Sequence, residues 1–225
     1  MGNAIGQMLT SAVGIAISPV PLIAVVLMLA TPRAKVNGTA FLLGWLVALA
    51  AVTTVVVLAG SGAGANDGGS PAGWTYWLKL VLGLLFLLMA AKQWRTRPRE
   101  GDAHELPSWM RAVDKFTPAK AVGLGALLAA ANPKNLVLAV GGAASIAGSP
   151  ASTGGKTVAA ALFVVIGSLC VLVPLLVYVF GGARSARVLQ EWKAWMGQHN
   201  AAIMTVLLTV LGAKYVGDAI SGLTN

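Results

Sequence analysis

The sequence consists of long apolar runs separated by short polar or charged segments. Six of the runs are long enough to cross about 30 Å of hydrocarbon, because a helix rises about 1.5 Å per residue. They cover approximately residues 4–30, 37–60, 73–94, 119–147, 156–181 and 200–221. The pattern predicts an all-α integral membrane protein with six transmembrane helices.

Two of these runs are interrupted by a polar segment that contains proline. The first run is interrupted between Ser18 and Pro21, and the fourth between Asn132 and Asn135. A proline inside a helix removes a hydrogen bond, whereas serine or asparagine followed by proline is typical of a helix start. We therefore expect helices one and four to be broken, with a new half-helix starting at each interruption.

The two interruptions also indicate an internal repeat, since Pro19 and Pro133 lie 114 residues apart. With three spans per half, the second copy starts on the opposite side of the membrane, which makes a 3+3 inverted repeat. Repeat 1 would cover about 4–94, a cytoplasmic loop about 95–118, and repeat 2 about 119–221. Residues 1–225 are predicted to form a single membrane domain.

The distribution of charge predicts how the chain is oriented. Only 10% of the residues are charged, the formal net charge is +9, and 57% of the residues are hydrophobic. The loops after the first, third and fifth runs hold twelve of the basic residues, whereas the opposite loops hold only Lys156. Positively charged loops stay in the cytoplasm, so we expect an inner-membrane protein with both termini outside the cytoplasm. This distribution explains the positive charge better than nucleic-acid binding, for which no motif is present.

The two interruptions form the candidate binding site. Half-helix starts near the middle of a membrane present the positive end of a helix dipole, and Lys134 adds a full positive charge. Irregular backbone at this depth is tolerated where it lines a cavity or is buried in protein, so we expect the two starts to face each other and to bind an anionic headgroup. The alternative is that Pro133 is a simple kink and that Lys134 bonds a neighbouring helix. The predicted substrate-binding residues are Ser18, Pro19, Pro21, Asn132, Pro133, Lys134 and Asn135.

Other residues are given structural roles. Lys214 and Asp218 lie four residues apart and can pair on one helix face. The segments 107–116 and 188–196 alternate apolar and basic residues and are expected to form short helices at the membrane surface, anchored by tryptophan. A single cysteine, Cys170, excludes an intrachain disulfide. We expect no metal, no cofactor and no enzymatic activity, because no nucleophile–base or metal-ligand set is visible.

Two longer motifs resemble a known family. They are Phe116-Thr117-Pro118-x-Lys120-Ala121-x-Gly123-x-Gly125 and the segment from Ala131 to Leu136, with Trp195-Met196-x-x-His199-Asn200 as a weaker third. The chain resembles the GAP family, the glycopeptidolipid- or sulfolipid-addressing proteins, of the lysine exporter (LysE) superfamily. The resemblance covers essentially the whole chain and implies a six-span actinobacterial protein that exports a cell-envelope glycolipid or helps to deliver it.

Three functional hypotheses remain open from the sequence. The first is a transporter or flippase that moves a lipid or glycolipid with an anionic or polar headgroup outward from the cytoplasmic side. The second is an exporter of a small solute such as an amino acid. The third is a scaffold that recruits lipid-synthesis or export machinery through the basic loop from Lys92 to Lys120. The expected partners are membrane lipids and such machinery, not nucleic acid.

Overall fold

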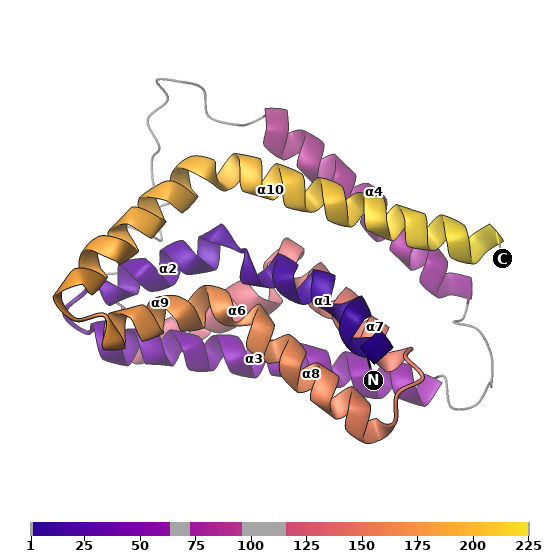
Figure 1. Ribbon diagram of the computed structural model, residues 1–225, viewed down its shortest axis with the longest axis horizontal. Helices are drawn as coiled ribbons and strands as arrows, with labels where there is room; N and C mark the ends of the chain where they lie inside the picture. Colours follow the sequence, from indigo (N-terminus) through magenta and orange to yellow (C-terminus); the bar gives the residue numbers. More distant parts are fainter. Residues whose placement is uncertain (1, 64–72, 96–115, 225) are drawn as a thin grey trace. The chain divides into compact units, whose positions relative to one another are not determined.

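The computed structural model describes residues 2–63, 73–95 and 116–224, and this part of the chain is helical and contains no strand (Figure 1). All of the predicted segment 107–116 except Phe116, and most of the loop 95–118, therefore lie outside the described residues. The helices, in chain order, are α1 (Gly2–Ala16), α2 (Pro19–Leu29), α3 (Ala34–Ala63), α4 (Gly73–Arg95), α6 (Pro118–Ala130), α7 (Pro133–Ala147), α8 (Thr153–Gly167), α9 (Leu169–Phe180), the short 3₁₀ helix η2 (Gly182–Arg184) and α10 (Ser185–Thr224).

The chain divides into two compact units, which we describe separately. The first unit comprises Met1–Asp67 and Leu106–Trp195, and the second comprises Gly68–Glu105 and Met196–Asn225. The candidate site lies entirely in the first unit.

Both predicted helix breaks are present in the first unit. Helices α1 and α2 meet at an angle of 41° across Ile17 and Ser18, and α6 and α7 meet at 63° across Ala131 and Asn132. In each case the second helix begins on proline, as the sequence predicts. Proline at the first helical position costs no hydrogen bond, because the N–H of any other residue there would have no partner within the helix.

The fifth run is also broken, which the sequence analysis did not predict. We expected one continuous span over 156–181, but α8 and α9 meet at 59° at Ser168. The Ser168 hydroxyl donates to the Val164 carbonyl at 2.6 Å, a contact that bends helices, and it lies at the break. Pro174 lies inside α9, where it crowds the Cys170 carbonyl just after the break.

The structure supports the predicted spans only in part. Among the described residues, α3 and α10 are long and apolar enough to cross a membrane, and the three bent pairs would raise the number to five. Helix α4 covers the third predicted run but is not among these five. Six spans in an inverted repeat therefore remain a prediction. The prediction of a separate surface helix over 188–196 is wrong, because that segment belongs to the first part of the continuous helix α10.

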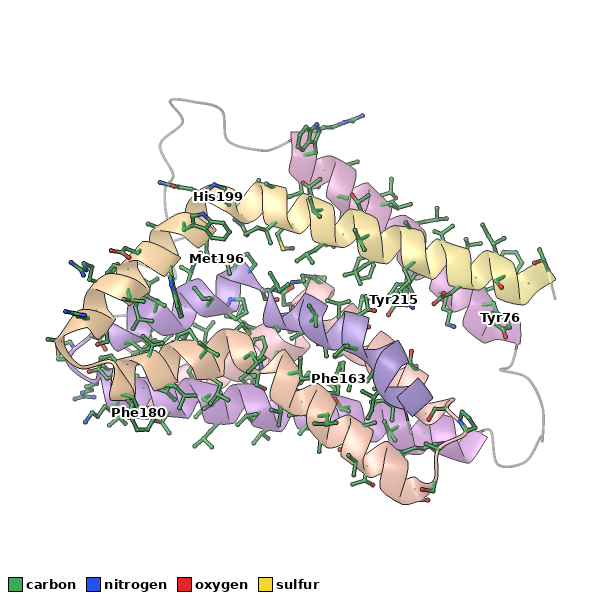
Figure 2. The ribbon with its side chains drawn as sticks, viewed as in Figure 1. Tyr76, Phe163, Phe180, Met196, His199 and Tyr215 are labelled. Atoms are coloured by element: carbon green, nitrogen blue, oxygen red, sulfur yellow. The ribbon has the colours of Figure 1, made fainter. Side chains whose placement is uncertain are left out.

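Helix α3 is central to the first unit. Its backbone lies close to that of α6, where a side chain on Gly44 would collide with the Val122 carbonyl and one on Gly125 with the Phe41 carbonyl. Figure 2 shows Phe163 of α8 within the unit, where it is fully buried. The outer face of α3 is apolar and exposed, as expected for a surface that contacts lipid: Val36, Leu43, Val47 and Leu58.

The second unit pairs α4 with the later part of α10. The two helices are antiparallel, because Gly83 lies against Val216 while Gly222 lies against Tyr76. Phe86 and Tyr215 pack edge to face with ring centroids 5.9 Å apart. Lys214 and Asp218 form the ion pair that their spacing predicts, at 2.8 Å.

Candidate binding site

The two helix breaks are joined directly by hydrogen bonds. The Lys134 ammonium donates to the Ser18 hydroxyl at 2.7 Å, and that hydroxyl donates to the Asn135 side-chain oxygen at 2.9 Å. These contacts connect positions 116 and 117 residues apart in sequence. The structure therefore brings together Ser18, Lys134 and Asn135, which we call the break cluster.

Each member of the break cluster is buried. The exposed fraction is 2% for Ser18, 3% for Lys134 and 0% for Asn135. A charged lysine at such a position is costly unless an opposite charge is nearby. The described residues include two carboxylates, and both are engaged within α10: Glu191 with Arg187 and Asp218 with Lys214.

Asn135 positions the cluster rather than offering donors to a ligand. Its side-chain N–H donates to the Leu128 carbonyl at 2.9 Å, one of the carbonyls near the end of α6 that has no partner within the helix. Its oxygen accepts from Ser18. The amide thus ties the end of α6 to α7 and to Ser18 at the start of α2.

The starts of α2 and α7 expose few N–H groups. Pro19 and Pro21 have no N–H, and the Lys134 N–H is bound by the Asn132 side chain at 3.1 Å. Ser18 makes no capping hydrogen bond to its own helix, because its hydroxyl is used by the cluster. The charge of Lys134 therefore dominates the electrostatics of the site, and the helix dipoles add to it.

Two buried residues of the first unit were not predicted as site residues. Cys170 is 3% exposed, lies near Lys134, and follows the unexpected break at Ser168. Trp45 of α3 is fully buried, and its indole N–H has no hydrogen-bond partner. The sequence signal for Cys170 was the pair Gly167-Ser168 just before it, since such pairs accompany kinks.

The described residues contain no group of three or more histidine, cysteine, aspartate or glutamate side chains that could hold a metal ion. Lys134 is the buried charge of this part of the chain, and its ammonium is a donor only. Chemically, the arrangement can bind an acceptor-rich or anionic group.

Comparison with known proteins identifies the family. A model of the Sap, sulfolipid-1-addressing protein family matches residues 8–221. The chain belongs to this family. The match confirms the resemblance to sulfolipid-addressing proteins, and family membership together with the apolar helices indicates a membrane protein with a lipid-related function. Neither a curated protein nor a solved structure matches the chain. The family match spans both helix breaks and therefore the whole break cluster.

Proposed function

We propose that this protein is a transporter or flippase that moves a cell-envelope lipid with an anionic headgroup outward across the inner membrane. The observation that carries the proposal is the buried ammonium of Lys134, for which the described residues offer a hydroxyl but no carboxylate. A negatively charged headgroup would supply the missing charge. The family name, sulfolipid-1-addressing, fits a sulfated headgroup.

In this proposal the break cluster binds the headgroup while the acyl chains stay in the lipid around the protein. Pro19, Pro21 and Pro133 set the breaks, Asn132 caps α7, and Ser18 and Asn135 hold Lys134 in place. The fold would be the six-span inverted repeat of the LysE superfamily, with both termini outside the cytoplasm. The protein would have no enzymatic activity, and lipid-synthesis or export machinery would be its partner.

Binding is tested first, with purified protein in detergent. We would measure thermal stability with a sulfated galactosylceramide, with its uncharged parent lipid, with phosphatidylglycerol and with free amino acids. A ligand that binds the folded state raises stability by mass action. We expect the sulfated lipid to stabilise the wild type and to have no effect on Lys134→Ala.

Transport is tested next, in phosphatidylcholine vesicles that contain a trace of fluorophore-labelled sulfated galactosylceramide. A membrane-impermeant reductant bleaches the outer leaflet only, so transport appears as bleaching beyond half of the signal. We expect this with wild type and not with Lys134→Ala. Stabilisation by amino acids instead would favour a small-solute exporter. Normal lipid movement by the mutant would rule out the assigned site, and binding without movement would favour a scaffold.

A further inference from the structure

We infer that Trp45 is a second headgroup-binding residue, whose indole N–H donates to the same anionic oxygens as Lys134. The inference deepens the proposed function and depends on it for the identity of the ligand. It starts from an unsatisfied group: Trp45 is 0% exposed, and its Nε1 has no hydrogen-bond partner. Indole is only a donor, and leaving a buried donor unpaired costs stability.

The face of α3 that carries Trp45 can be identified from its neighbours. A side chain at Gly38 would contact Leu29 and Leu175, the former in α2 and the latter in α9. Leu49 lies beside Gly167 at the end of α8, where Ile15 of α1 also packs. Positions 38, 45 and 49 are seven and four residues apart, so they share one face of the helix. Trp45 therefore lies on the face of α3 that packs against the broken helix pairs α1–α2 and α8–α9, where this face borders α6, since Gly125 of α6 lies beside the Trp45 backbone nitrogen.

The depth of Trp45 along that face matches the breaks. The chain from α1 to α2 runs opposite to α3, because Ile15 meets the level of Leu49 whereas Leu29 meets that of Gly38. The chain from α8 to α9 also runs opposite to α3, because Gly167 lies beside Leu49 whereas Leu175 lies beside Gly38. Trp45 is one helical turn from Leu49, about 6 Å along the axis.

The residues opposite Trp45 follow from this direction. Ile15 and Gly167 meet Leu49, and Ser18 and Cys170 lie three residues after them. Ser18 and Cys170 therefore lie at the level of Trp45. Ser18 accepts the hydrogen bond from Lys134, and Cys170 lies near it. The unpaired indole N–H and the unpaired charge thus occur at one depth of the same unit.

The two groups lack the same thing, an acceptor. Lys134 has three N–H donors, of which one is directed to Ser18, and Trp45 has one. A single oxyanion with several acceptor oxygens, such as sulfate or phosphate, satisfies both at once. An uncharged headgroup can accept hydrogen bonds but supplies no counter-charge, so the buried charge of Lys134 selects against it.

The substitution that tests this is Trp45→Phe, which keeps an aromatic ring and removes the donor. A hydrogen bond to a charged group contributes more to binding than one between neutral groups. We therefore expect the affinity for sulfated galactosylceramide to fall about tenfold or more. The matched control is Trp77→Phe in α4, since Trp77 is 59% exposed. This variant should bind sulfated galactosylceramide with the affinity of wild type. Equal affinity of Trp45→Phe and wild type would overturn the inference.

A second measurement needs no change at Trp45, in case Trp45→Phe does not fold. The chain has seven tryptophans, so protein labelled with ¹⁵N-tryptophan gives at most seven indole N–H signals. Phenylalanine substitution at the other six assigns theirs, and the remaining signal belongs to Trp45. We expect the sulfated lipid to shift this signal downfield and its uncharged parent to leave it unchanged.

The outcomes separate this inference from the proposed function. If the sulfated lipid stabilises wild type but the Trp45 signal does not move, the inference fails and the function stands. If inorganic sulfate alone moves the signal as much as the lipid does, the oxyanion site is supported and the lipid is not its specific ligand. If neither ligand stabilises wild type nor moves the signal, both proposals fail.

Discussion

Lys134 and Asn135 are neighbours in sequence and are both buried, yet they should respond to substitution in opposite directions. Lys134 carries a charge with no carboxylate partner in the described chain, whereas both ends of the Asn135 amide are hydrogen-bonded. Removing a costly buried charge stabilises a fold, and removing a satisfied buried amide destabilises it. This contrast separates a residue kept for binding from one kept for structure.

The first prediction concerns Lys134→Met, which keeps most of the side-chain volume and removes the charge. We expect the free energy of unfolding of the ligand-free protein to rise by about 1–3 kcal/mol, since the charge is no longer buried. Thermal or denaturant unfolding in detergent measures this. A loss of stability of that size would show that Lys134 serves the fold and would count against the binding site.

The second prediction concerns Asn135→Ala, which leaves the Leu128 carbonyl without its side-chain donor and the Ser18 hydroxyl without its acceptor. We expect a loss of about 1–3 kcal/mol, measured in the same unfolding experiment. Ala131→Ser, at an exposed position in the same turn, is the control and should change stability little. Unchanged stability of Asn135→Ala would mean that the hydrogen bonds of the break cluster do not hold the two breaks together.

At the scale of elements, proline determined which breaks could be predicted. Pro19 and Pro133 follow a capping residue and were readable as helix starts, and the structure begins α2 and α7 on them. The break at Ser168 was missed because Pro174 lies six residues later and no proline follows the serine directly. The meeting of Ser18 with Lys134 could be expected from the repeat, but the burial of Trp45 depends on packing, which periodicity does not give.

The third prediction concerns the contact between α3 and α6. Gly125 lies against the Phe41 carbonyl, so even a methyl group forces the helices apart, whereas Gly123 on the same helix has open space around its Cα. We expect Gly125→Ala to cost about 1–3 kcal/mol of stability and Gly123→Ala to cost nothing measurable. Thermal unfolding of the two variants in one detergent makes the comparison. Equal stability of the pair would mean that α3 and α6 are not in close backbone contact.

At the scale of the molecule, most of the described basic residues of the first unit, apart from Lys156 and the buried Lys134, lie toward one end. Figure 1 shows the α2–α3 and α9–α10 connections at the same end of this unit; Arg33 and Arg184 lie in these connections, and Lys35 and Arg187 lie in the first turns of α3 and α10. The start of α6 joins them, because the Asn37 side chain donates to the Phe116 carbonyl at 3.0 Å. Lys156 lies at the other end, where it donates to the Ala147 carbonyl at 2.6 Å.

The fourth prediction follows from this separation of charge. Since positive ends remain in the cytoplasm, the end with Arg184 should face inward and the start of α8 outward. We would place one cysteine at an exposed position of each end, Gly154→Cys and Ala183→Cys, and treat right-side-out membrane vesicles with an impermeant maleimide. Gly154→Cys should be labelled at once, and Ala183→Cys only after the membrane is opened.

The native chain is the control for this experiment, because its single cysteine, Cys170, is buried and should stay unlabelled in both conditions. The reverse pattern would place both termini in the cytoplasm and reverse the direction in which the break cluster could deliver a headgroup. Labelling of both positions in sealed vesicles would contradict a membrane crossing by the bent pair α8–α9, which lies between them. The proposed outward movement of lipid therefore depends on the same charges that orient the first unit.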